Sequence, residues 1–230
     1  MTNRSATGIT GCMTFVLAAI ALFPCASPAG VPHRQVWAGQ NPNAAVLPIG
    51  SRPHGKTYGE WSVLWWQWFL PLTVEQYNDC RIGQSDDNVA FLLAGPAACN
   101  GKVAPGTTLF FPIANVECSS LEDPPFHGDT PDQRSACAAY WAGFVGTMAV
   151  EIDGVPIQNL TSYHVVSPDL RFKVGSDNVF GIPCSGECSG KSSGNGYYLM
   201  LTPLPPGSHT IHITASGFGI DTRYSLFVRP

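Results

Sequence analysis

The chain has 230 residues, of which only 12% are charged, and its 12 Lys+Arg against 16 Asp+Glu give a net charge of -4. About 25% of the residues of an ordinary globular protein are charged. The sequence has no basic patch and no run of like charge, which excludes nucleic-acid binding through phosphate neutralisation. Its 24 Gly and 20 Pro favour many turns, and therefore short strands over long helices.

Residues 1–29 are predicted to be an export signal. Arg4 provides the positive charge, residues 12–23 the apolar segment, and residues 27–29 a small-residue cleavage site. A lipoprotein signal ending at Cys25 is the alternative, but bulky residues precede that cysteine. The apolar segment is too short for a comfortable membrane span, and no later segment is long enough for one. We therefore expect a secreted or periplasmic protein without a membrane span.

Removal of the signal leaves an even number of cysteines in an oxidising compartment, which predicts disulfides. The six are Cys80, Cys99, Cys118, Cys137, Cys184 and Cys188. Among the 15 possible connectivities we favour sequential pairing, because each pair then brackets one Gly/Pro-rich excursion. A zinc site is the alternative, but there is no C-x2-C pair and no histidine at ligand spacing beside these cysteines.

Residues 30–56 lack periodicity and are predicted to form an extended arm or linker, with a candidate short strand at 44–49. A helix is predicted over 57–69, where four of the six tryptophans lie. Thr57 and Glu60 have the spacing of a capping box, and Pro71 ends the helix.

Helical periodicity places the aromatic residues of 57–69 on one side and two polar residues, Glu60 and Gln67, on the opposite side. The rings can simply fill the space between helix and sheet, which is the usual role of tryptophans at helical spacing. They can also line a cleft beside a carboxylate and an amide.

The remaining elements are expected to be short strands, with one further helix. Asp153-Gly154 between two apolar runs is the strongest hairpin signal. Pro112 suggests that its strand lies at an edge or bends. The predicted strands cover 88–94, 107–113, 148–152, 155–160, 163–166, 170–174, 197–202, 209–215 and 224–228, with a helix beginning after Thr130, a polar loop at 115–131 and a Gly/Ser-rich loop at 181–196.

This order of elements predicts a mainly β protein, a two-sheet antiparallel sandwich of the jelly-roll or immunoglobulin-like kind with one or two short helices packed near its N-terminal part. Residues 57–230 are expected to form a single domain, because there is no repeat and no second domain boundary.

Several stretches resemble a group of exported bacterial proteins of uncharacterised function. They are Gly59-Glu-Trp-x3-Trp-Trp-x-Trp68, Phe91-Leu-Leu, Phe110-Phe-Pro-Ile-x-Asn-x-Glu117, Asp153-Gly154 and Pro203-Leu-x2-Gly-x-His-Thr-Ile211. The resemblance covers most of the mature chain and implies no activity or cofactor. The last stretch is also similar to final strands of immunoglobulin-like extracellular domains, which is a cue to fold alone.

The candidate site residues are acids, amides and aromatic rings that suit a glycan. Glycoside hydrolysis needs two acids, for which Glu60 and Glu117 are the candidates, and His127 is the candidate general acid or base. The candidate ligand-binding residues are Trp65, Trp66, Gln67 and Asn115.

Other motifs are weaker. The loop at 115–132 could bind Ca2+ through its acidic residues, but it lacks EF-hand spacing. The run Gly190-Lys-Ser-Ser-Gly194 matches a hydrolase nucleophile motif and part of a phosphate loop, but neither has the required surroundings. We assign no metal and expect no cofactor.

Two functions are therefore considered. The first is a secreted, disulfide-stabilised β-sandwich that binds an extracellular ligand, such as a glycan, or a partner protein. The alternative is a secreted hydrolase that acts on polysaccharide through a carboxylate pair. An enzyme would place two carboxylates in one concave pocket, at least one with a raised pKa, whereas a binding module would present an aromatic surface without that pair.

Overall fold

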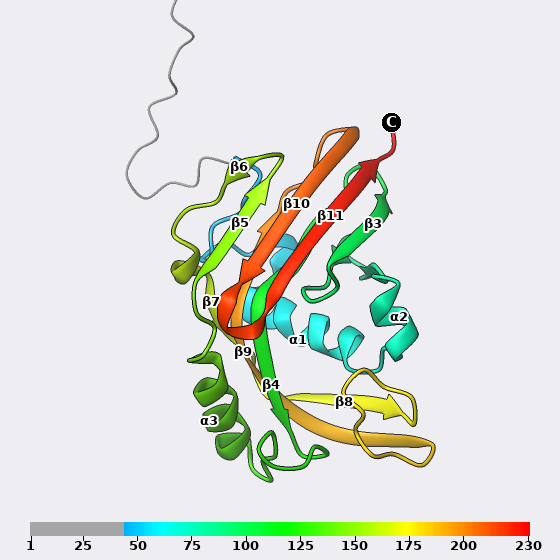
Figure 1. Cartoon of the computed structure of the whole chain (residues 1–230), viewed down its shortest axis with the longest axis vertical. Helices are drawn as coiled ribbons and strands as arrows, with labels where there is room; N and C mark the ends of the chain where they lie inside the picture. The colour runs from blue at the N-terminus through cyan, green and yellow to red at the C-terminus, as the bar shows by residue number, and fades with distance from the viewer. Residues whose placement is uncertain (1–43) are drawn as a thin grey trace, which may run out of the picture. The chain divides into compact units, whose positions relative to one another are not determined.

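A computed structural model describes residues 44–230 (Figure 1). The predicted signal at 1–29 and residues 30–43 of the predicted arm lie outside the described residues. Within 44–230 the chain is mainly β and forms two sheets, as the composition and the turn signals predicted. No helix in this part of the chain is long and apolar enough to cross a membrane.

Sheet A is the more deeply buried of the two sheets. Its strands, in spatial order, are β1 (Gly83–Gln84), β2 (Val89–Phe91), β4 (Thr108–Ser119), β9 (Glu187–Leu201) and β7 (His164–Val166), and β8 (Leu170–Gly175) also pairs with β9. Sheet B contains, in order, β3 (Ala98–Val103), β11 (Ile220–Val228), β10 (Gly207–Ala215), β5 (Met148–Ile152) and β6 (Val155–Pro156). Figure 1 shows β10 and β11 side by side, with β5 and β3 flanking them.

The helices and 3-10 turns lie around and between these strands. They are α1 (Tyr58–Phe69), α2 (Val74–Asn78), α3 (Pro131–Ala142), η1 (Pro53–Gly55), η2 (Leu160–Tyr163) and η3 (Ser216–Phe218).

The prediction of purely antiparallel sheets was wrong in two places, because β2 runs parallel to β4 and β3 runs parallel to β11. The reason is the position of β3. The chain leaves sheet A after β2, adds β3 to sheet B, and returns to sheet A as β4. Such a crossover lets neighbouring strands run in the same direction, which a short hairpin cannot do.

The layers follow from burial. Along β10 and β11, buried and exposed residues alternate, so sheet B has one core face and one solvent face. Most residues of β4 are buried, as are those of the second half of β9, so sheet A is covered on both faces. On one face Phe110 and Tyr198 contact rings of α1. On the other face β4 contacts β5 and β10 of sheet B.

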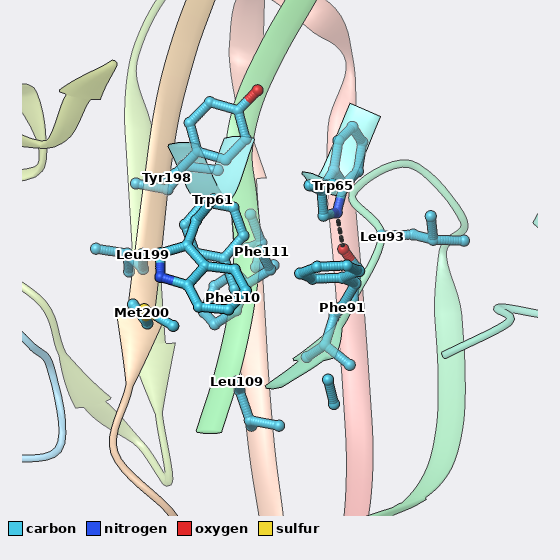
Figure 2. Close-up of a cluster of buried hydrophobic side chains, with 14 of the residues drawn as sticks. Trp61, Trp65, Phe91, Leu93, Leu109, Phe110, Phe111, Tyr198, Leu199 and Met200 are labelled. Carbon is cyan, nitrogen blue, oxygen red and sulfur yellow. Dashed lines mark hydrogen bonds between the residues drawn. The ribbon is translucent and has the colours of Figure 1, made fainter. Parts of the chain in front are cut away.

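The helix α1 confirms its prediction at both ends. Thr57 accepts a hydrogen bond from the backbone of Glu60, and the Glu60 carboxylate accepts one from the backbone of Thr57. Trp61 and Trp65 are 0% and 1% exposed, so both belong to the core. Figure 2 shows these two indoles among the side chains of sheet A, with a hydrogen bond of 2.9 Å from Trp65 Nε1 to the Leu92 carbonyl.

The three sequential disulfides are confirmed within the described part of the chain. Cys80 bonds to Cys99, Cys118 to Cys137, and Cys184 to Cys188. The second of these joins β4 to α3 and encloses the loop between them.

The predicted Gly/Ser loop at 181–196 was wrong over most of its length, because β9 begins at Glu187. The glycines inside β9 are required by the close approach of other residues. A Cβ at Gly190 would lie 2.7 Å from Leu121, and a Cβ at Gly194 would lie 2.2 Å from Trp66 Nε1. Glycine inside a strand often marks such contacts.

The strand that contains Pro112 is interior, not at an edge as one interpretation had it. Its pairing with β9 shifts register between Pro112 and Ala114, which is the bend that the other interpretation predicted.

The hairpin at Asp153-Gly154 is confirmed. Both residues have positive φ, 51° and 74°, as a two-residue hairpin turn of type I′ requires. Residues 44–56, the described part of the predicted arm, lie against the domain, and Val46 forms a β-bridge with Leu201 at the end of β9.

Candidate functional site

A cavity of about 710 Å³ lies between α1, the C-terminal part of β4, the loop that follows β4, the end of α3 and the turn η3. Half of its described lining residues are aromatic: Trp65, Trp66, Phe69, Tyr77, Phe126, Trp141, Phe144, Phe180 and Phe218. Its polar side chains are Asn115, Glu117 and Glu122. Ligand pockets typically combine an apolar wall with a few such polar groups.

The cavity extends from the core to the surface. Trp65 and Trp66 are each 1% exposed and form its floor. Phe144 and Phe180 are 51% and 45% exposed and lie at its mouth. The lining therefore ranges from exposed rings to rings that are almost fully buried.

Glu117 is the deepest acid of the cavity. It lies near the end of β4 and is only 3% exposed. The Ser192 hydroxyl donates a hydrogen bond to its Oε2. Its Oε1 is buried and has no donor among the described residues. Burial raises the pKa of the Glu117 carboxyl well above its ordinary value, and the neighbouring Glu122 raises it further.

Glu122 is the partner of Glu117. The two carboxyl groups lie within hydrogen-bond reach of each other, and burial raises the pKa of Glu122 as well. Two carboxylate oxygens repel each other, whereas a protonated acid donates to a carboxylate. The pair therefore holds a shared proton at the pH where one of the two acids is ionised.

The loop after β4 holds Glu122 in this position. The Ser119 hydroxyl donates to Glu122 at 2.9 Å and also accepts from the Glu122 backbone at 3.2 Å. The ring Nδ1 of His127 lies 2.7 Å from the Glu122 carbonyl. Backbone hydrogen bonds from Ser119 to Phe126 and from Gly128 to Ser119 close the loop.

Asn115 and Glu117 are two residues apart on β4, so they share one face of the strand. The Asn115 amide donates to the Tyr198 hydroxyl at 2.9 Å. Burial raises the pKa of Tyr198, so its hydroxyl stays protonated. Trp66 Nε1 lies beside Gly194 and makes no hydrogen bond of good geometry among the described residues.

Four of the predicted site residues thus meet in one cavity, namely Trp65, Trp66, Asn115 and Glu117. The structure places the other three outside its lining.

Glu60 caps the start of α1 with a side chain that is 50% exposed, and its hydrogen bonds to Thr57 lower its pKa. Gln67 is exposed and donates to the Arg171 carbonyl at 2.9 Å. His127 supports the loop behind Glu122, and its other ring nitrogen lies 3.0 Å from Asp129, which raises the pKa of the imidazole.

Glu122 is the site residue that the sequence reasoning missed as a partner of Glu117. A partial signal was present, since Ser119-x-x-Glu122 has the spacing of a capping box, in which each side chain accepts a hydrogen bond from the backbone N–H of the other residue. That spacing indicates a turn from Ser119 to Glu122, but it does not by itself bring Glu122 to Glu117.

The site offers hydrogen bonds, a transferable proton and flat apolar faces. Among the described residues, no group of three or more His, Cys, Asp or Glu side chains is arranged to hold a metal ion. No family model matches the chain, and no curated protein or solved structure matches it either.

Proposed function

We propose that this protein is an exported binding protein whose aromatic cavity takes a glycan. The observation that carries this proposal is the cavity itself, in which rings form the wall and Asn115, Glu117 and Glu122 supply the polar groups. The faces of sugar rings are apolar and stack on aromatic side chains, while their hydroxyl groups need hydrogen-bond partners. The three disulfides support export, because such bonds persist in oxidising compartments.

A second candidate function is favoured by the carboxyl pair. Two acids with raised pKa in one cavity are typical of catalytic sites, and a pair that shares a proton can act as both acid and base. The protein would then be a hydrolase of polysaccharide that uses Glu117 and Glu122. In this carboxylate pair Glu122 takes the place that the sequence had suggested for Glu60.

The separation of the two acids favours binding over hydrolysis. Retaining glycosidases hold their carboxyl groups about 5–5.5 Å apart, and inverting enzymes hold them farther apart. Glu117 and Glu122 are in hydrogen-bond contact, which leaves no room between them for a sugar or a water molecule.

The test is a titration of the full mature protein with soluble oligosaccharides, in which tryptophan fluorescence reports binding. Because Trp65, Trp66 and Trp141 line the cavity, a bound sugar should change the emission of the protein. Trp141→Ala and Phe144→Ala should each weaken binding about fivefold or more, as expected for the loss of an aromatic contact of about 1 kcal/mol or above.

Phe227→Ala is the matched control, because Phe227 is 43% exposed, close to the 51% of Phe144, but does not line the cavity. Absence of binding by every sugar, or equal affinities for Trp141→Ala and Phe227→Ala, would refute the proposal. New reducing ends that form with the wild type and not with Glu122→Gln would instead establish the hydrolase.

A further inference from the structure

We propose that the ligand of this cavity carries an ammonium group, which lies between the aromatic rings and the carboxyl pair of Glu117 and Glu122. This inference rests on the proposed binding function and specifies its ligand class. For a glycan, it means an amino sugar with a free amine.

The charge of the cavity is the first argument. Among the described residues that line it there is no Lys, Arg or His, and its acids are Glu117 and Glu122. Water is largely excluded from the floor, where the two indoles are buried. An ionised acid of the pair attracts a positive charge more strongly in such a low-dielectric site than in water, which offsets the cost of removing that charge from water.

The second argument is the buried oxygen without a donor. Once the shared proton has left, Glu117 Oε1 has no hydrogen-bond donor among the described residues, because the neighbouring Glu122 is then a carboxylate as well. Buried polar atoms in proteins normally have a partner. An ammonium group has three N–H donors and can serve both carboxyl groups at once.

The third argument separates an organic cation from a metal ion. No described cluster of His, Cys, Asp and Glu is arranged to hold a metal, and the aromatic wall has no further oxygen ligands to offer beyond Asn115. Aromatic faces attract organic ammonium groups through the ring quadrupole, with Trp the strongest of the three rings. The wall and the acid pair therefore suit the same ligand group.

Binding of a cation should release the shared proton, because two ionised carboxylates hold an ammonium group better than one. The groups that face the pair are the hydroxyls of Ser119 and Ser192, neither of which titrates. His127, behind Glu122, favours the ionised form of that acid. Arg134 on α3 is engaged with Asp169. Affinity for a permanently charged ligand should then rise with pH.

The experiment compares two tetrasaccharides of the same length and linkage, one of glucosamine and one of N-acetylglucosamine, by calorimetry at about pH 6, where the free amine is charged. We expect the amine to bind at least about tenfold more tightly. If the acetylated sugar binds as tightly or more tightly, the inference is overturned and the proposed function stands. If neither these two nor any other sugar binds, both fail.

Glu122→Gln keeps the shape of the side chain and removes its charge, and Glu151→Gln, at an exposed position of β5, is the control. We expect the first variant to lose about tenfold or more in affinity for the amine and the second to lose none. An unchanged affinity in a folded Glu122→Gln would overturn the inference.

A measurement on the wild type alone avoids the question of folding. Benzylammonium stays charged between about pH 5 and 8, and benzyl alcohol is its neutral counterpart. Titrations in buffers of different ionisation enthalpy should show proton release with the cation and none with the alcohol. Preference for the alcohol, or no proton release with the cation, would contradict the inference.

Discussion

The carboxyl of Glu117 is enclosed by β4, β9 and the loop that carries Glu122. It therefore holds its proton more tightly in the folded protein than in the unfolded chain. In the unfolded chain the group titrates near its ordinary pKa of 4.5. Its contribution to stability is therefore complete below about that pH and is lost as the pH rises toward the raised pKa of the folded state.

Glu117→Gln should remove the loss of stability that the Glu117 carboxyl causes as the pH rises. Between about pH 5 and 8, the free energy of unfolding of the wild type should fall by up to about 1.4 kcal/mol per pH unit where the acid titrates, and the variant should fall less. Urea denaturation at several pH values measures the difference. Glu151→Gln controls for the removal of an exposed acid, and all three proteins keep His127 and His209, whose raised pKa values act in the same direction. Parallel pH profiles for the wild type and Glu117→Gln would contradict the prediction.

At this scale the sequence revealed half of the site. Asn115 and Glu117 were named as polar residues of a predicted loop, whereas β4 continues through them to Ser119 and its period of two puts both on one face. Trp65 and Trp66 were named because they are adjacent in the tryptophan-rich helix. The sequence could not bring Glu122 to Glu117, because a turn of five residues can point a side chain in many directions. Glu60 was a reasonable candidate for an acid beside the tryptophans. The end of the helix at which it lies decides its role, since only the other end of α1 reaches the cavity.

Among the elements, α1 depends on its first turn. Thr57→Ala should cost about 1 kcal/mol of stability, because it leaves the Glu60 backbone amide without its side-chain acceptor. Thermal or urea denaturation measures this cost, and exposed Thr161→Ala is a control outside any cap hydrogen bond that the structure shows for α1. Ligand affinity should not change, since Thr57 does not line the cavity. Equal stability of the two variants would show that the cap contributes nothing.

The strand β9 depends on a glycine under Trp66. Gly194→Ala should cost about 1–3 kcal/mol, because the new methyl group would lie 2.2 Å from Trp66 Nε1 and 2.9 Å from the Ser167 hydroxyl. Gly175→Ala on β8 is the matched control, since its methyl group would meet nothing closer than 3.9 Å. Chemical denaturation of both variants tests the contrast, and a Gly194→Ala protein as stable as Gly175→Ala would contradict it.

These glycines also explain why β9 was not recognised from the sequence. Small and flexible residues indicate a loop when only local preference is considered. Gly190 and Gly194 are instead small because side chains from other elements press against the strand. Those neighbours are remote in the sequence, so no local pattern contains them. By contrast, the cap of α1 and the Asp153-Gly154 turn depend on adjacent residues, and both were predicted correctly.

For the whole molecule, the disulfides should differ in effect. Loop-closure entropy predicts a loss of about 3 kcal/mol when Cys118 and Cys137, separated by 19 residues, are both replaced by Ala, and about 2 kcal/mol for Cys184 and Cys188, separated by 4. Only the first replacement should weaken ligand binding, because that bond ties α3, with Trp141, to the strand of Glu117. Denaturation and titration of both double variants test this. The prediction would be contradicted if the variant without Cys184 and Cys188 bound the ligand more weakly while the variant without Cys118 and Cys137 bound it as the wild type does.

The two-sheet architecture was predictable because it follows from strand count, turn composition and alternation, which are properties of the whole sequence. The direction of β2 relative to β4 was not predictable, since it depends on which sheet receives β3. Nothing within residues 98–103 specifies a sheet. The choice is made by contacts such as the packing of Ile82 and Leu226 against Gly101.

The outward face of sheet B carries residues that can be substituted or labelled without a change in the lining of the cavity. Ser225 and Thr210 are paired across β11 and β10, both are exposed, and neither lines the cavity. A dye or a tether fixed there would leave the binding chamber open to solution. The molecule can thus be anchored to a sensor chip through these two positions without a change to any residue that lines the cavity.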